Sequence, residues 1–108
     1  LPPCCKKCNG VLKSDVVHFN EAIPPDVAQA SLEEVERCDL MLICGTSATV
    51  YPFAMLPRMA AEKKDKRKMT IIEINAEPTP LTREGISDYF IEGKTGVILP
   101  RIAGEVKK

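Results

Sequence analysis

Three small residues, Gly45-Thr46-Ser47, directly follow the apolar run Leu40 to Cys44. A glycine at the end of a strand lets the backbone approach a ligand closely, and the two hydroxyls can donate hydrogen bonds to phosphate or sugar oxygens. The same residues could also form an ordinary turn in which Thr or Ser caps the next helix. Because one glycine is far from a complete dinucleotide-binding fingerprint, both interpretations stay open on these residues alone.

A second polar pair follows the next apolar run, TIIEIN at 70–75. Asn75 ends this run and Glu77 comes two residues later. A polar side chain at the end of the second strand of a βαβ unit commonly binds ribose hydroxyls. An Asn that precedes Pro78 can equally serve to turn the chain. The pair is therefore a candidate ligand site with an equally good structural explanation.

The cysteines suggest a metal or redox site near the N-terminus. Cys5 and Cys8 form a C-x-x-C pair followed by Asn-Gly, which suits tetrahedral zinc, although zinc normally needs four ligands. Cys4 could be a third ligand, and a redox pair is the alternative. Cys38 and Cys44 lie beside or within the first apolar run, so we expect them to be inert core residues.

The remaining polar features are weaker. His18 is the only histidine and has no nucleophile or carboxylate at a defined spacing, so it is poor evidence for catalysis. The run EKKDKRK at 62–68 mixes acids and bases, which is typical of a solvated helix end and loop and less so of a binding patch.

Composition sets the class of protein. The 108 residues suffice for one domain, and 15 basic residues balance 15 acidic ones, so nothing favours direct binding of nucleic acid or of an anionic membrane. No apolar run reaches the length of roughly 20 residues that crosses a bilayer. Five cysteines, an odd number, favour a reducing, intracellular compartment, but cytoplasm, nucleus and mitochondrion are not distinguished.

The apolar pattern predicts helices alternating with strands. The expected elements are a short extended piece at 16–19, a helix over 24–37, a strand over 40–44 buried on both faces, a helix after Pro52 that Pro57 kinks or starts, a strand over 70–75, an irregular loop AEPTPLT at 76–82, a strand over 88–91 and a helix from Gly93 onward. This order predicts an α/β fold with a parallel sheet. Three strands are few for such a sheet, so the chain reads like part of a larger one.

Four segments in order resemble one family. CKKCNGVLKSDVVHFNEAIP (5–24), GTSATVYP (45–52), INAEPTPLT (74–82) and GKTGVILP (93–100) are similar to the C-terminal half of a sirtuin, an NAD-dependent protein lysine deacylase. The resemblance covers nearly the whole chain. It implies a Rossmann-like fold in which residues 1–15 are the second half of a zinc-binding module and residues 16–108 are the C-terminal part of the NAD-binding domain.

The resemblance also implies roles for individual residues. Structural zinc would be bound by Cys5 and Cys8. NAD would be bound by Gly45, Thr46, Ser47, Asn75, Glu77, Lys94 and Thr95. The acylated-lysine peptide would be bound by Val17, Phe19, Asn20, Glu21 and Val50.

Some parts of the family pattern are absent or altered. The glycine-rich loop, the catalytic His and the first zinc cysteine pair do not occur in these 108 residues, so no catalytic residue is assigned and the chain alone should be inactive. His18 occupies the variable position of V-V-x-F and does not take that catalytic role. Asn9 and Asn20 stand where the family usually has glycine.

Three hypotheses remain at this point. The first is an NAD-dependent deacylase of which this chain is a fragment that requires the missing N-terminal half. The second is a non-catalytic nucleotide- or partner-binding half-domain that completes its sheet with another chain. The third is a small metal-binding adaptor organised by Cys4, Cys5 and Cys8.

Overall fold

The computed structural model describes residues 2–108. Within this described part, four helices and three strands alternate. In order they are α1 (Pro25–Arg37), β1 (Leu40–Cys44), α2 (Leu56–Glu62), β2 (Thr70–Asn75), α3 (Pro80–Arg83), β3 (Tyr89–Glu92) and α4 (Thr95–Val106). Two 3-10 turns, Phe53–Met55 and Lys63–Asp65, flank α2. The predicted alternation of helices and strands is confirmed.

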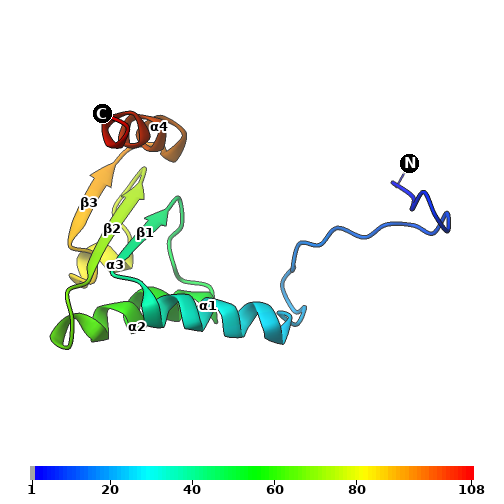
Figure 1. Cartoon of the computed structure of the whole chain (residues 1–108), viewed down its shortest axis with the longest axis horizontal. Helices are drawn as coiled ribbons and strands as arrows, with labels where there is room; N and C mark the ends of the chain where they lie inside the picture. The colour runs from blue at the N-terminus through cyan, green and yellow to red at the C-terminus, as the bar shows by residue number, and fades with distance from the viewer. Residues whose placement is uncertain (1) are drawn as a thin grey trace.

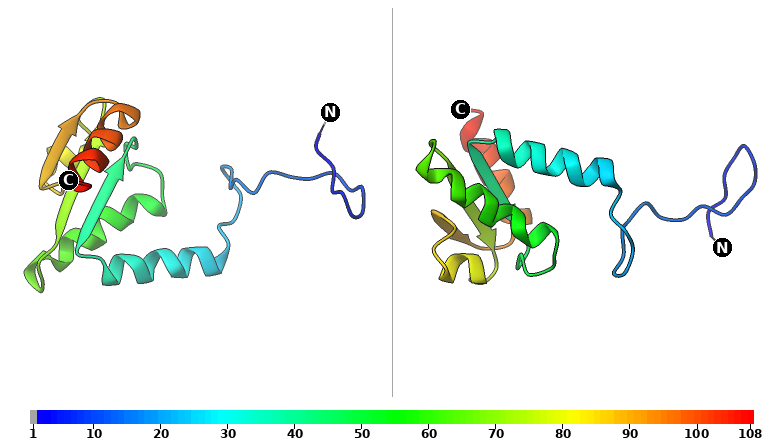
Figure 2. Two further views of the ribbon diagram at one scale, coloured as in Figure 1. Left: turned by 45° about the horizontal axis from the view of Figure 1, so that its top comes forward. Right: turned by 90° about the horizontal axis from the view of Figure 1, so that it is seen from below.

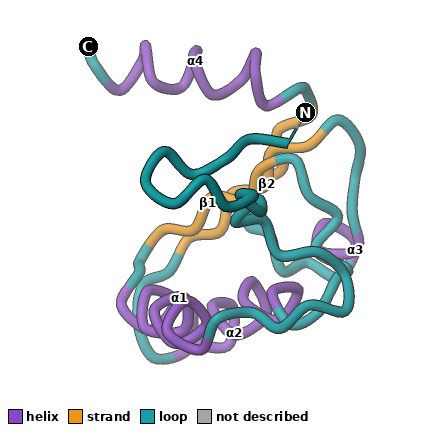
Figure 3. Tube along the Cα trace, turned by 90° about the vertical axis from the view of Figure 1, so that its right-hand side faces the viewer, coloured by secondary structure: helices purple, strands orange, loops and turns teal. Residues whose placement is uncertain are grey.

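The strands form one parallel sheet in the order β1-β2-β3. Leu40 pairs with Thr70 at the start of β1, and Ile72 pairs with Tyr89 at the start of β3. All three arrowheads therefore point the same way, towards α4, while α1 and α2 lie together near the other end (Figure 1). Seen from the side, β1 and β2 lie between the α1–α2 pair and α4 (Figure 3).

The core is built where α1, α2 and α3 meet β1 and β2. Its buried members are Val35, Ile43, Ala60, Met69, Ile71 and Leu81. They come from five helices and strands and, in the case of Met69, from the residue just before β2, so the short elements are stabilised mainly by packing against one another and only weakly by their own helical or strand propensity. Three apolar residues of α1 at i, i+4 and i+7 differ in burial: Val35 is buried, Ala28 is half-buried and Leu32 is exposed.

β1 corrects one prediction. It was expected to be buried on both faces, but only Ile43 is buried, while Leu40 and Leu42 are 49% and 46% exposed. Cys44, expected to be an inert core residue, is also exposed, whereas Cys38 is half-buried against the core. The reason is that β1 is an edge strand and no described segment covers the face that carries Leu40, Leu42 and Cys44.

Prolines lie in the first turn of α1, α2 and α3, and at the last two they correct or sharpen the predictions. Pro57 lies in the first turn of α2, so it marks the start of that helix and does not kink it. The segment AEPTPLT was expected to be irregular, and this was wrong for its second half, because Pro80 is the first residue of α3. The N–H that proline lacks would have had no helical partner at that position.

The basic run after α2 is more ordered than expected. Lys63 donates to Val35 O at 3.2 Å, Arg67 to Cys38 O at 2.6 Å, and Lys64 to Ile86 O at 3.0 Å. Three of its cations thus connect the segment after α2 to the end of α1 and to the residues before β3. The expectation of a solvated run holds for Lys66 and Lys68, which are exposed.

The N-terminal segment extends away from the sheet (Figure 2). Within residues 2–24 the only regular pairing is an isolated antiparallel bridge between Cys4 and Val11, and 16–19 forms no strand. Across residues 2–108, no helix is both long enough and apolar enough to cross a membrane.

Candidate functional site

The three strands end at one edge of the sheet, and this edge gathers the predicted NAD-binding residues. Gly45 N donates to Ile74 O at 2.9 Å, and Gly93 N donates to Asn75 O at 2.9 Å. These bonds hold the residues directly after β1 and β3 beside the last two residues of β2. In parallel α/β sheets, ligands bind beyond the carboxyl ends of the strands.

Gly45 lies next to the start of α4. Its φ of +64° lies in the left-handed region, and a Cβ at this position would lie 3.5 Å from Thr95 Cγ2. The first N–H groups of a helix have no partner within the helix, so the start of α4 presents donors beside Gly45. Gly45 and Thr95 lie 50 positions apart in the sequence but next to each other at the carboxyl edge of the sheet.

The loop after Gly45 exposes hydroxyl groups. Thr46 Oγ1 accepts a hydrogen bond from Ala48 N at 3.1 Å, and Ser47 Oγ lies 3.0 Å from Thr49 Oγ1. Ala48 has a φ of +51°, which is unusual for a residue other than glycine. A strained backbone next to exposed hydroxyls is typical of ligand-binding loops.

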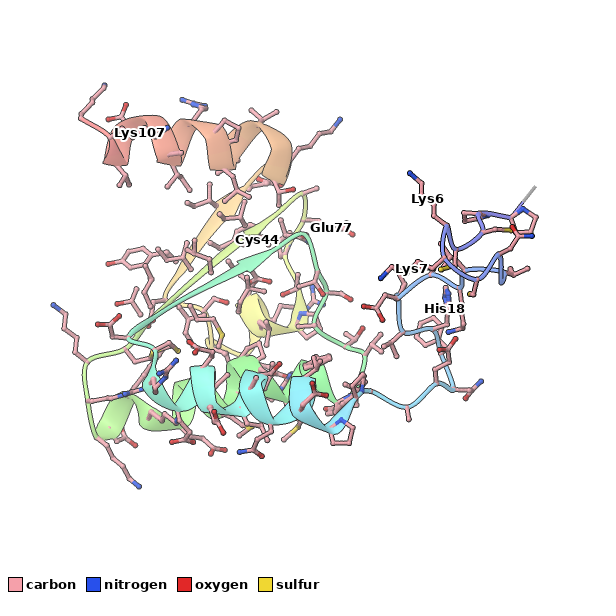
Figure 4. All side chains as sticks on the ribbon, turned by 45° about the vertical axis from the view of Figure 1, so that its right-hand side comes forward. Lys6, Lys7, His18, Cys44, Glu77 and Lys107 are labelled. Carbon is pink, nitrogen blue, oxygen red and sulfur yellow. The ribbon has the colours of Figure 1, made fainter. Side chains whose placement is uncertain are left out.

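Asn75 takes part in the turn that follows β2. Its Nδ2 donates to Glu77 O at 2.8 Å, so the turn-forming role considered from the sequence is present. Its side-chain oxygen has no hydrogen bond among the described residues, and Asn75 is only half-buried. Glu77 is exposed and lies near the end of β1, where Cys44 is labelled (Figure 4).

A groove of about 1050 Å³ runs along β1. It brings together the predicted peptide-binding residues Val17, Phe19, Asn20, Glu21 and Val50 with Thr46 and Ser47. The other predicted NAD-binding residues, Gly45, Asn75, Glu77, Lys94 and Thr95, lie outside its lining. The apolar groove and the polar carboxyl edge therefore meet at the loop that carries Thr46 and Ser47.

The groove also contains residues that the sequence analysis did not single out. Tyr51 and Phe53 follow Val50 directly and line the same groove. Both side chains are partly exposed, at 63% and 40%. Their position on either side of Pro52, directly after a candidate binding motif, is the signal that could have identified them. His18 also lines the groove and lies on the N-terminal segment (Figure 4).

The two asparagines that the resemblance places at glycine positions both lie where the backbone turns left-handed. Asn9 has a φ of +59° and Asn20 a φ of +67°. After glycine, asparagine is among the residues that tolerate this conformation best. The two substitutions therefore preserve the local backbone.

The Cys5–Cys8 pair lies on a tight turn. Asn9 N donates to Cys5 O at 2.8 Å, and Lys7 N donates to Cys5 Sγ at 3.4 Å. Hydrogen bonds from the backbone of Cys8 and then of Lys7 lower the pKa of the Cys5 thiol, which favours the thiolate that binds metals. Among residues 2–108, however, no three His, Cys, Asp or Glu side chains lie close enough to hold a metal ion.

Comparisons with known proteins identify one family. The Sir2 family model matches residues 1–52. The chain is 43% identical, over its whole length, to NAD-dependent protein deacylase 2 of Pyrobaculum aerophilum, and 42% identical over 98% of its length to NAD-dependent protein deacylase 1 of Archaeoglobus fulgidus. It covers 41% of each of these relatives.

The fold agrees with the sequence match. A crystal structure of a Sir2 homologue in complex with NAD superposes with a TM-score of 0.76 at 41% identity, over 99% of this chain and 40% of the other. The Rossmann-like parallel sheet expected from the resemblance is thereby confirmed. The match along the whole chain and the shared fold lead to one conclusion: the chain belongs to the Sir2, or sirtuin, family and corresponds to the C-terminal part of its members.

Proposed function

We propose that the chain is the C-terminal part of an NAD-dependent protein lysine deacylase, and that it supplies one wall of the NAD site and one wall of the acyl-lysine site. The observation that carries this proposal is the junction between the apolar groove and the hydroxyl-bearing loop at Thr46 and Ser47. A deacylase must hold an aliphatic acyl-lysine and a polar dinucleotide in contact. The relatives are named NAD-dependent protein deacylases, which supports this assignment.

The carboxyl edge has the features that a dinucleotide requires. Gly45 leaves space in front of the start of α4, because it has no side chain and its backbone is left-handed. We assign phosphate and ribose contacts to Gly45, Thr46 and Ser47, the adenosine ribose to Asn75 and Glu77, and the surroundings of the adenine to Lys94 and Thr95. When bound, NAD supplies the ADP-ribose that accepts the acyl group of lysine, with release of nicotinamide.

The groove has the features that an acylated peptide requires. Val17, Phe19 and Val50 are 42%, 82% and 57% exposed, so their apolar surfaces are available to an acyl chain and the lysine methylenes. Asn20 and Glu21 follow on the same segment, and we assign them contacts to the peptide backbone. No residue of the chain is assigned as the general base, which must lie within about 3 Å of the ribose hydroxyl proton.

Residues 1–15 would form half of a zinc-binding module, and residues 16–108 part of the NAD-binding domain. The turn at Cys5 and Cys8 fits zinc, because backbone N–H groups stabilise the thiolate and the two cysteines have the spacing of a zinc pair. Two further ligands would come from outside the chain. Zinc would supply structural stability to this module and no chemistry to the deacylation.

A non-catalytic half-domain is the second candidate, and the uncovered face of β1 favours it. Leu40 and Leu42 leave apolar surface that a segment of another polypeptide could cover. In this candidate the chain completes its sheet with that polypeptide and binds a nucleotide or a partner, but it does not deacylate peptides.

The decisive experiment compares the 108-residue chain with the product of the complete open reading frame, called here the full-length protein. If the open reading frame encodes no residues before Leu1, the full-length protein is replaced in the assay by a chimera that carries the N-terminal segment of the Archaeoglobus relative. NAD binding is measured by calorimetry, and deacylation of an acetyl-lysine peptide by mass spectrometry. We expect binding and turnover only in the full-length protein. Binding without turnover would support the half-domain, and tight NAD binding by the 108-residue chain would refute the split site.

A further inference from the structure

One charged side chain is buried in the middle of the sheet. Glu73 is the only charged residue of β2, and its relative exposure is 0%. Its neighbours along the strand, Ile72 and Ile74, are apolar. Within residues 2–108 no lysine, arginine or histidine forms an ion pair with it.

Three hydroxyl groups satisfy the Glu73 carboxylate. Thr79 Oγ1 donates to Oε2, while Thr82 Oγ1 and Ser87 Oγ donate to Oε1 at 2.5 and 3.0 Å. A carboxylate buried without hydrogen bonds would strongly destabilise the fold, so these donors are required if Glu73 is to stay inside. Thr79 is itself buried, with 3% relative exposure.

All three donors lie in the segment 76–88, which connects β2 to β3. The first residues of this segment form the turn in which Asn75 Nδ2 donates to Glu77 O at 2.8 Å. A further bond joins Thr79 N to Thr82 Oγ1 at 3.1 Å, so Thr82 binds both Glu73 and the start of α3. The segment is therefore bound to β2 through three side chains. The turn that contains Glu77 lies between β2 and the first of these side chains, Thr79.

The direction of the side chains adds to this coupling. Side chains two residues apart on a strand point to the same face, so Ile71, Glu73 and Asn75 share one face of β2. Asn75 thus lies on the same face of β2 as Glu73, whose carboxylate is bound to the segment that folds back over the strand.

We propose that Glu73 is a positioning residue for the NAD site: through Thr79, Thr82 and Ser87 it fixes the segment 76–88 and so sets the placement of Asn75 and Glu77 at the carboxyl edge. This inference rests on the proposed function, which assigns Asn75 and Glu77 to the adenosine ribose. It adds a residue that does not touch the ligand. Glu73 and its three partners also lie outside the lining of the peptide groove.

The test uses the full-length protein with Glu73→Gln, which keeps the size of the side chain and one acceptor oxygen. The amide NH2 cannot accept a hydrogen bond from Thr79, so one hydroxyl loses its acceptor. We expect the Kd for NAD, measured by calorimetry, to rise about tenfold, and amide hydrogen exchange in 76–88 to accelerate in the NAD-free protein. The Kd and KM for the acylated peptide should change by less than about twofold.

Ile71→Val is the matched control, because it also removes buried contacts from β2 but leaves the carboxylate and its donors in place. It should lower the free energy of unfolding without changing the Kd for NAD. Ser87→Ala is the milder variant if Glu73→Gln does not fold, and it should raise the Kd for NAD about two- to threefold.

The outcomes distinguish a failure of the proposed function from a failure of the positioning role of Glu73 alone. If the unaltered full-length protein does not bind NAD, the proposed function is refuted and this inference with it. If the unaltered protein binds NAD, but Glu73→Gln, or Ser87→Ala in its place, has the same Kd as Ile71→Val, only the positioning role of Glu73 is refuted. An equal loss of NAD and peptide affinity would also refute it, because it would show a general structural effect.

Discussion

Gly45→Ala adds one methyl group at the point where β1 meets α4. The new Cβ would lie 3.5 Å from Thr95 Cγ2, which is an ordinary contact, so the cost to folding comes from the left-handed backbone alone. That cost is about 1–2 kcal/mol. The methyl group would also occupy space that we assign to NAD, and one extra methyl or methylene in a binding pocket costs about 1–3 kcal/mol, or roughly 10–200-fold in affinity.

Gly85→Ala is the matched control. Gly85 has nearly the same backbone, with a φ of +72° against +64°, but no atom lies within 4 Å of the Cβ that the substitution would add. It precedes β3, which is the outer strand on the other side of the sheet from β1. Both variants of the full-length protein should therefore lose a similar free energy of unfolding in urea titrations. Gly45→Ala should weaken NAD binding by calorimetry far more than Gly85→Ala, which can affect the NAD site only indirectly, through the segment 76–88. Equal NAD affinities in the two variants would refute the placement of NAD at Gly45.

Three further predictions concern other parts of the full-length protein. A hydrogen bond from Lys64 and then one from a backbone N–H lower the pKa of Asp88 below 3.8, so Asp88 stabilises the fold above about pH 4 and this contribution is lost as the pH falls further. Asp88→Asn should therefore lower the free energy of unfolding by about 1 kcal/mol at pH 7, and the loss is small because the side chain is 35% exposed. At acid pH the free energies of unfolding of the variant and the unaltered protein should converge, and a constant difference between pH 7 and pH 3 would contradict this. Phe19→Ala should raise the KM for an acylated peptide by about tenfold and leave the Kd for NAD unchanged, whereas Val11→Ala, at an exposed position outside the groove, should change neither; an effect on NAD alone would show that the groove is assigned wrongly. Cys8→Ser should abolish bound zinc, measured by atomic absorption, and a full equivalent of zinc in the variant would exclude Cys8 as a ligand.

The order of elements could be predicted from the sequence because each has a strong local signal. The β-branched run 70–75 predicts a strand, and the prolines at 24 and 25 predict the start of α1. The contact between Gly45 and Thr95 has no such signal, because it depends on how two distant elements pack. The family resemblance placed both residues at one ligand, and the geometry puts them in contact.

Burial was the less predictable property. An apolar run such as Leu40 to Cys44 shows that a strand can be buried, but whether a face is covered depends on which segments are available to pack on it. Glu73 shows the opposite case, because a charge in the middle of an apolar run usually points to solvent and here is buried. The donors at 79, 82 and 87 lie 6 to 14 residues away, and no periodic pattern connects them with Glu73.

The exposure of Cys44 makes the molecule suitable for chemical footprinting. Its thiol lies on the face of β1 that no described segment covers, whereas Cys38 is half-buried and donates to Val35 O at 3.5 Å. The rate of alkylation at Cys44, divided by the rate at Cys38 in the same sample, therefore reports how completely that face is covered, independently of reagent concentration. Mass spectrometry of the two peptides could follow assembly of the sheet in cell extracts, where calorimetry is not practical.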